Sequence, residues 1–327
     1  MAVPTNTIQQ VTRVGNREDL ADIIYNIDPV ETPFVSSIGK TKADAVYHEW
    51  QTDTLAAADP QNKAIQGDVL TNSNRAPTVR LGNYTQIFWK QIDTSTTQRA
   101  VKAAGRADEH GYQIAKAGKE LKRDMETRFT GNFAAVPPAA ATPGESAGMQ
   151  GFFRTNVSRG AAGVNPTLSG GTAGYPLAAA VNGTQRASTE NLLKTVVKLV
   201  YDNGGELKIA MMGTGQKQIA STFPGIAQLR HETGTSKVQI IGGAEVYASD
   251  FGNLTMVPNR FIGTPTTGGS NREIILYDPE MWSVATLDPL KREPLGKQGL
   301  SDRDLIFGEM TLRCNNERAG GIIADLA

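Results

Sequence analysis

The sequence predicts an α+β protein, and three segments carry that prediction. Residues 45–96 hold two stretches rich in β-branched and aromatic side chains, which are typical of strands. A long helical pattern follows, from about Arg106 to Thr130. From residue 189 onward, helical and strand patterns alternate before the chain ends in a strand-rich region. With 327 residues, the chain is long enough to bury a substantial core.

Residues 1–44 are predicted to form an N-terminal arm that carries one short helix. Residues 1–15 show no apolar periodicity, and Asn16 is a plausible N-cap for the helix that follows. Pro29 ends the helix, because the residue before a proline disfavours helical geometry. Ten residues are too few for a stable isolated helix, so we expect its apolar face to dock on another surface. That face consists of Leu20, Ile23, Ile24 and Ile27.

Residues 45–96 are predicted to form an extended β-hairpin, a two-stranded ribbon. Its two strand-like stretches are separated by the 22 mostly polar residues Ala56–Pro77. An isolated ribbon is at best marginally stable in water, and a connection this long within a folded protein is usually functional or disordered. We therefore expect the ribbon to require a partner surface.

Residues 97–130 are predicted to be dominated by the long helix, on the order of 37 Å in length at 1.5 Å per residue. Most of its surface is charged, and one narrow apolar stripe runs along it. We expect this stripe to form the packing seam of the helix. It consists of Ile114, Gly118, Leu121, Met125 and Phe129.

The remaining segments differ in composition. Residues 131–188 are rich in Gly, Ala and Pro and are interpreted as a loop or flexible surface insertion, in which "GMQGFFRT" is expected to form a small packed knot. Residues 189–262 are predicted to form an α/β domain, opening with a buried helix capped by Thr189 and including a strand pair that turns at Gly242 and Gly243. Residues 263–327 are predicted to be mainly strands.

The charge and cysteine content exclude several classes of protein. The chain has 33 Lys and Arg residues and 33 Asp and Glu residues, so its net charge is zero. Proteins that grip nucleic acid through its phosphates normally carry a cationic excess. One cysteine, Cys314, cannot form an intrachain disulfide and fits a reducing compartment. No stretch approaches the 18 apolar residues of a membrane span, and the N-terminus does not resemble a signal peptide.

No catalytic, cofactor or metal site is predicted. His48, His110 and His231 have no metal-ligand spacing and are interpreted as solvated or locally hydrogen-bonded. The stretch "GTGQKQ" from Gly213 to Gln218 lacks the spacing and the hydroxyl residue of a phosphate loop. Cys314 has apolar neighbours and no evident base, which is typical of a buried structural thiol. The chain is therefore expected not to be an enzyme.

Several stretches along the whole chain resemble one group of proteins. They are "VGNREDLADIIYNI", "TPFVSSIG", "HEWQTD", "GNYTQIF", "AGKELKRDMET", "VYASDFGNLTMVPNR" and "DPEMWSVATLDP". In this order they resemble the major capsid proteins of tailed bacteriophages and prophages, which have the Hong Kong 97-type fold. The resemblance implies that residues 45–96 are the extended loop, residues 97–130 the spine of the peripheral domain, and residues 189–262 the axial domain. Residues 263–327 would return to the peripheral domain, and Gly118 would let the spine helix approach its sheet closely.

The resemblance also implies a function and partners. Copies of the chain would assemble as hexamers and pentamers into an icosahedral head around double-stranded DNA, in the cytoplasm of a bacterial host. A separate scaffolding protein and a portal are the expected partners, with no membrane and no sequence-specific contact to DNA. Whether a decoration protein also binds is left open by the sequence. Two alternatives remain open: an encapsulin-like protein nanocompartment, distinguished by what the particle contains, and a soluble α/β enzyme with residues 45–96 as a lid. The enzyme would require a pocket with convergent titratable groups.

Overall fold

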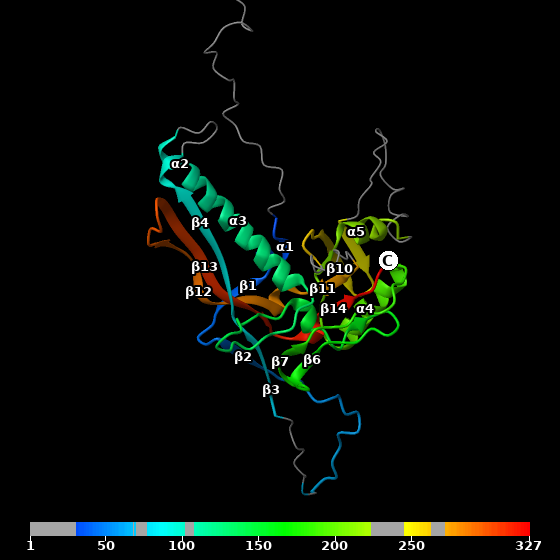
Figure 1. The fold of residues 1–327 in the computed structure, drawn as a ribbon. Coiled ribbons are helices and arrows are strands. Elements are labelled where there is room, and N and C mark those ends of the chain that lie inside the picture. The colour runs from blue at the N-terminus through cyan, green and yellow to red at the C-terminus, as the bar shows by residue number, and fades with distance from the viewer. Residues whose placement is uncertain (1–30, 68, 70–76, 102–107, 224–244, 263–271) are drawn as a thin grey trace, which may run out of the picture.

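The computed structural model describes residues 31–67, 69, 77–101, 108–223, 245–262 and 272–327. The described chain forms three β-sheets, a long helix and several shorter helices (Figure 1). Two apolar cores hold it together, one beneath the long helix and one around the helix Glu190–Asp202. The structure is therefore of the α+β class that the sequence predicts.

The first sheet, here the spine sheet, has the strand order β1-β12-β13-β4. Strand β1 (Gly39–Lys42) pairs parallel with β12 (Trp282–Leu295), and the other pairs are antiparallel. Strand β13 (Ser301–Cys314) lies between β12 and β4 (Gln86–Ser95). Helix α3 (Glu109–Thr130) runs along this sheet in Figure 1, with α1 (Pro33–Ser37) beside its C-terminal half and α2 (Thr96–Ala100) near its N-terminal end.

The second sheet, here the ribbon sheet, has the order β2-β3-β7-β6. Strands β2 (Tyr47–Thr52) and β3 (Val79–Tyr84) form an antiparallel hairpin, as predicted. Strand β4 was predicted to continue this hairpin, and that assignment is wrong, because β4 pairs with β13 along its length. The residue types of Gln86–Ser95 identify a strand, but they do not specify which strand pairs with it. Its partner lies more than 200 residues later in the chain.

The segment 131–188 was interpreted as a flexible insertion, and the structure corrects this. Strand β7 (Ala173–Ala178) pairs with β3 and with β6 (Thr167–Gly170), while β5 (Val157–Ser158) joins the third sheet. The predicted knot around the short helix η2 (Met149–Gly151) is confirmed, since Met149, Phe152 and Phe153 are almost fully buried. Few apolar residues are present here, but they are large and fill the space between the sheets.

The third sheet, here the axial sheet, has the order β5-β14-β11-β8-β10-β9. Besides β5, it contains five strands: β8 (Ile209–Met212), β9 (Val246–Ser249), β10 (Gly252–Pro258), β11 (Ile274–Tyr277) and β14 (Gly321–Ile323). Helices α4 (Glu190–Asp202) and α5 (Thr214–Ala220) accompany it. The sheet therefore takes strands from before residue 189 and after residue 262, so the axial unit is not one continuous segment.

Two further details differ from the sequence prediction. Helix α4 buries one face, formed by Leu193, Val196, Val197 and Val200, and exposes the other, and the Thr189 side chain makes no capping hydrogen bond. The strand pair β9–β10 turns at residues 250–251, while Gly242 and Gly243 lie outside the described residues. The remaining short helices are η4 (Pro279–Met281) and η5 (Glu317–Ala319), which begin after the capping residues Asp278 and Asn316.

Candidate assembly surfaces

The base of the β2–β3 ribbon is anchored in the body of the protein. Trp50 on β2 is 5% exposed, and its ring lies 6.1 Å from that of Phe152. Tyr47 and Tyr84 face each other across the hairpin, with ring centroids 4.7 Å apart, and Tyr175 of β7 packs against both. The partner surface that the ribbon requires at its base is thus supplied by its own chain.

The tip of the ribbon has no such cover within the described residues. Residues 53–67 extend away from the body in Figure 1, and all of them are exposed. Three large aliphatic side chains lie in the tip: Leu55 is 100% exposed, Ile65 is 77% exposed and Val69 is 91% exposed. Single exposed aliphatic side chains are normal on a protein surface, but three on one projecting segment offer apolar area to another molecule.

The structure places the predicted stripe of the spine helix α3 unevenly. Leu121, Met125 and Phe129 are buried, and Ile114 is half-buried against the same core. The ring of Phe129 meets Phe88 of β4 edge-on at 5.8 Å, which fixes the helix over the spine sheet. Ala117, which the sequence prediction did not include, is also buried.

Gly118 does not have the role that the sequence suggested. A Cβ atom built on Gly118 would meet no atom of the described residues within 4 Å, so within this part of the chain the position is not one of close approach. It instead borders an open hollow between α3 and strands β12 and β13. Gly118 does lie on the face of the helix that the spacing predicts. Because glycine has no side chain, however, its place on that face does not imply that the helix packs closely there.

A buried carboxylate on α3 connects three parts of the fold. Glu126 accepts hydrogen bonds from the backbone N–H groups of Phe34 and Val35, both at 2.8 Å, and from the side-chain amide of Asn259 at 2.7 Å. Burial raises the pKa of the Glu126 carboxyl above its ordinary value, and these three hydrogen bonds act in the opposite direction. The charged appearance of the α3 sequence gives no sign of this role, because the donors are far away in the chain.

A second buried polar cluster lies near the start of α3. His110 is bound on one ring nitrogen to the Thr94 hydroxyl at 2.8 Å and on the other to the Asp304 carboxylate at 2.6 Å. Arg292 donates two hydrogen bonds to the same carboxylate. Although burial disfavours the Asp304 charge, the bonds from Arg292 and His110 hold its pKa below the ordinary value. His110 is therefore buried rather than solvated, and its two hydrogen bonds reach Thr94 and Asp304 on two strands of the spine sheet rather than local neighbours.

The face of the spine sheet that points away from α3 carries exposed apolar side chains. Along β4, Phe88 and Ile92 turn inward, while Ile87 and Trp89 turn outward and are 58% and 59% exposed. Strand β4 is the last strand of its sheet, so its outer edge is unpaired within the described residues. Together these features make β4 the second candidate contact surface of the subunit.

The described residues contain no candidate metal site. They include no group of three or more His, Cys, Asp or Glu side chains that could hold a metal ion. Cys314 is fully buried, and burial raises its pKa well above the ordinary thiol value, so the reactive thiolate is disfavoured. The described helices include none long and apolar enough to cross a bilayer. The four residues of the predicted arm-helix face, Leu20, Ile23, Ile24 and Ile27, lie outside the described residues.

Comparison with known proteins gives a consistent picture. A family model described as the SU10 major capsid protein matches residues 3–327. The major capsid protein of Escherichia phage Phieco32 is 26% identical over 343 residues, covering 94% of each chain. Among solved structures, a subunit of the cyanophage A-1(L) capsid superimposes with a TM-score of 0.66 at 11% identity, over 98% of this chain and 99% of that one. The holo-SrpI encapsulin complex from Synechococcus elongatus superimposes with a TM-score of 0.55 at 12% identity, over 98% and 96% of the two chains.

The superpositions run over nearly the whole chain and show the fold. A projecting ribbon, a spine helix laid along a four-stranded sheet and a separate six-stranded sheet together constitute the Hong Kong 97-type architecture. Since the family match runs over almost the entire length of the sequence, the chain belongs to the SU10 major capsid protein family.

Proposed function

We propose that copies of this chain assemble, as hexamers and pentamers, into the icosahedral head of a tailed phage around double-stranded DNA. Membership of a major capsid protein family supports a structural role. Assembly through the ribbon is supported by the burial pattern of the ribbon. Its base is anchored by the buried Trp50, while its tip exposes Leu55, Ile65 and Val69. An interface that covers these side chains would remove their apolar area from water.

The charge of the chain suits a container better than a nucleic-acid-binding protein. With 33 cationic and 33 anionic residues, it offers no cationic excess to phosphate. The wall of a shell can enclose DNA without neutralising it, so we propose no sequence-specific contact. A separate scaffolding protein, a portal and a decoration protein are the proposed partners, and assembly is proposed to occur in the host cytoplasm, with the mature subunit located in the virion.

We also propose that the protein is not an enzyme, because the family to which it belongs is a structural one.

An encapsulin-like compartment is the second candidate function, favoured by the superposition on an encapsulin over nearly the whole chain. At 12% identity that superposition supports the fold alone, whereas the family match supports a phage capsid. Nuclease-protected DNA inside particles would indicate a phage head, and a single protein cargo would indicate a compartment.

Deletion of the ribbon tip, residues 56–77, tests the assembly mechanism. The deleted segment begins beyond β2 and ends before β3, so the paired base of the hairpin is retained. We expect a soluble subunit with an unchanged circular dichroism spectrum that forms no closed shells in negative-stain microscopy. Normal shells from the deleted protein would refute a role of the ribbon in assembly.

A matched variant separates the chemistry of the tip from its length. Replacing Leu55, Ile65 and Val69 with serine keeps the length of the segment and removes its exposed aliphatic groups. We expect fewer shells at a given subunit concentration. Replacing the exposed polar residues Gln61 and Lys63 of the same segment with serine should leave assembly unchanged.

A further inference from the structure

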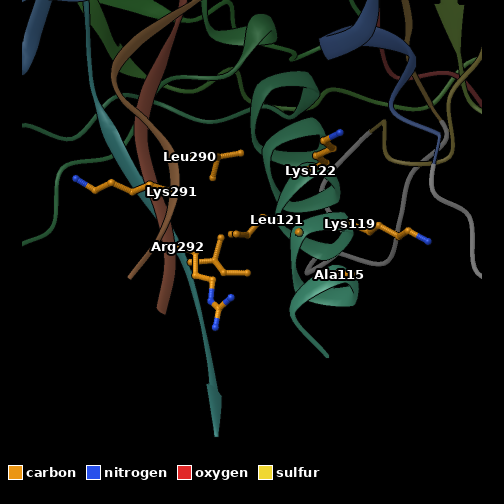
Figure 2. A pocket seen from close by; sticks show the side chains of 9 residues that line it. Ala115, Lys119, Leu121, Lys122, Leu290, Lys291 and Arg292 are labelled. Atoms are coloured by element: carbon orange, nitrogen blue, oxygen red, sulfur yellow. The ribbon is translucent and has the colours of Figure 1, made fainter. Parts of the chain in front are cut away.

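An open hollow lies between the spine helix and the edge of its sheet, and we name it the spine hollow. It has a volume of about 370 Å³ and is open to solvent. Nine residues line it: Ala115, Gly118, Lys119, Leu121, Lys122, Leu290, Lys291, Arg292 and Ile306. In Figure 2, Leu121 of α3 points toward Leu290 and Arg292 of β12 across the hollow.

The floor of the spine hollow is apolar. Leu121 and Ile306 are buried beneath it, and Leu290 is 39% exposed at its side. Because Gly118 has no side chain and open space above it, nothing from α3 fills the centre. The hollow can therefore take up aliphatic side chains from another segment without moving the backbone around it.

The rim of the hollow is cationic. Four of its nine lining residues are Lys or Arg, and none is acidic. Lys291 forms an ion pair with Asp288, and Arg292 with Asp304. Lys119 and Lys122 form no ion pair with any carboxylate of the described residues, and in Figure 2 they extend from α3 on the side away from β12. An occupant with apolar groups and nearby carboxylates would complement both the floor and the rim.

We propose that the spine hollow receives residues 16–28 of the same subunit. This segment, "NREDLADIIYNID", combines the aliphatic residues Leu20, Ile23, Ile24 and Ile27 with four acidic residues. The acidic residues are Glu18, Asp19, Asp22 and Asp28. In a helix, its apolar groups would share one face, flanked by Asp19 on one side and Asp28 on the other. These two carboxylates are the ones placed to pair with Lys119 or Lys122.

The position of the first described helix places this segment within reach. The backbone N–H of Phe34 is held 2.8 Å from Glu126 of α3. Lys122 and Lys119 precede Glu126 by four and seven residues, so all three side chains lie on one face of the helix. Along the helix axis, Lys122 is about 6 Å and Lys119 about 10 Å from Glu126. The five residues from Asp28 to Pro33 can span about 16 Å when extended. A segment tethered this closely also has a high effective concentration at its own subunit, compared with a neighbour's segment.

Disulfide trapping in assembled particles tests the placement and the choice of subunit. Leu290→Cys is combined in turn with Leu20→Cys, Ile23→Cys, Ile24→Cys and Ile27→Cys, while Cys314 stays buried and unreactive. We expect at least one pair to form an intrachain disulfide, seen as loss of two free thiols without a dimer on a non-reducing gel. As a control, Ile24→Cys with Thr195→Cys on the exposed face of α4 should form none.

The other outcomes overturn the proposal. A dimer on the non-reducing gel would show that the hollow receives the arm of a neighbouring subunit. Failure of all four pairs to form a disulfide would show that residues 16–28 lie elsewhere. The disulfide test does not involve the ribbon. The docking proposal can therefore be refuted while shells still form normally, which would leave the proposed function intact.

Blocking the hollow gives a second test that does not depend on cysteine geometry. Gly118→Phe should fill the open space without disturbing the core, and should make chymotryptic cleavage within residues 20–25 at least tenfold faster. The charge reversal Lys119→Glu with Lys122→Glu should have the same effect, and adding Asp19→Lys with Asp28→Lys should restore protection. Lys116→Glu, on the same helix but outside the hollow, serves as the matched control. Equal cleavage rates in all these variants would refute the docking.

Discussion

The carboxylate of Glu126 accepts a hydrogen bond from the backbone N–H of Phe34 at 2.8 Å, across 92 residues of the chain. Through this bond and its companion at Val35, the spine helix α3 satisfies the first N–H groups of α1, which have no partner within their own helix. The Asn259 amide binds the same carboxylate from the end of β10. One side chain thus connects the N-terminal segment, the spine helix and the axial sheet.

Loss of this carboxylate should destabilise the subunit strongly. Glu126→Ala leaves three donors without an acceptor, and each buried unsatisfied group costs about 1–3 kcal/mol. We expect the free energy of unfolding, measured by urea denaturation of free subunits, to fall by at least about 3 kcal/mol. Glu126→Gln keeps one oxygen acceptor and should cost less. Glu120→Ala, on the same helix but partly exposed, should change the value by no more than about 0.5 kcal/mol.

The apolar seam of α3 should not tolerate a charge. Leu121 is 1% exposed and Met125 is 6% exposed, so Leu121→Asp or Met125→Asp would bury an unpaired carboxylate. We expect neither variant to yield folded subunits. Lys119→Ala, at an exposed position of the helix, should alter the free energy of unfolding by about 0.5 kcal/mol or less. Similar thermal melts for all three variants would contradict the orientation of the helix.

Glu273 should make the stability of the subunit depend on pH. Burial raises the pKa of its carboxyl to about 7, while Arg159 and Arg272 oppose the shift and Asp325 adds to it. Because the folded protein holds this proton more tightly than the unfolded chain, stability is highest below the unfolded pKa of about 4.5 and falls as pH rises through about 7. The total loss is roughly 3 kcal/mol.

Urea denaturation between pH 5 and pH 8 measures this effect. Glu273→Gln cannot ionise, so the variant should lose this part of the pH dependence and gain relative stability at pH 8. Asp288→Asn, at a partly exposed acidic residue on β12, should leave the slope between pH 5 and pH 8 unchanged. A wild-type slope that persists in Glu273→Gln would assign the pH dependence to other groups.

The two faces of β4 should respond differently to truncation. Ile87 and Trp89 are more than half exposed, so Ile87→Ser and Trp89→Ser should change the free energy of unfolding of free subunits by about 0.5 kcal/mol or less while lowering the yield of shells. Phe88→Ala on the inward face removes a ring packed against Phe129, and should cost about 3–5 kcal/mol. Unchanged shell yield in both outward variants would remove β4 from the candidate contact surfaces.

Local pattern alone was enough to locate much of the secondary structure. The periodicity of α3 gave its end at Thr130 and three of its buried residues, Leu121, Met125 and Phe129. The β-branched and aromatic stretches gave the hairpin of β2 and β3 and the later strands. These features depend on neighbours a few residues apart, and periodicity reports such neighbours directly.

The tertiary structure decided which strands pair and which polar side chains are buried. Strand β4 looked like the second half of the ribbon, but its hydrogen-bonding partner is β13, because a strand's composition does not specify its neighbour. The charged sequence of α3 does not indicate that Glu126 and His110 are buried, because their partners Phe34 and Asp304 are 92 and 194 residues away. The sequence by itself therefore determined most of the longer elements and the family resemblance. The short strands within 131–188, the burial of polar groups and the open space beside Gly118 depended on segments brought together only by folding.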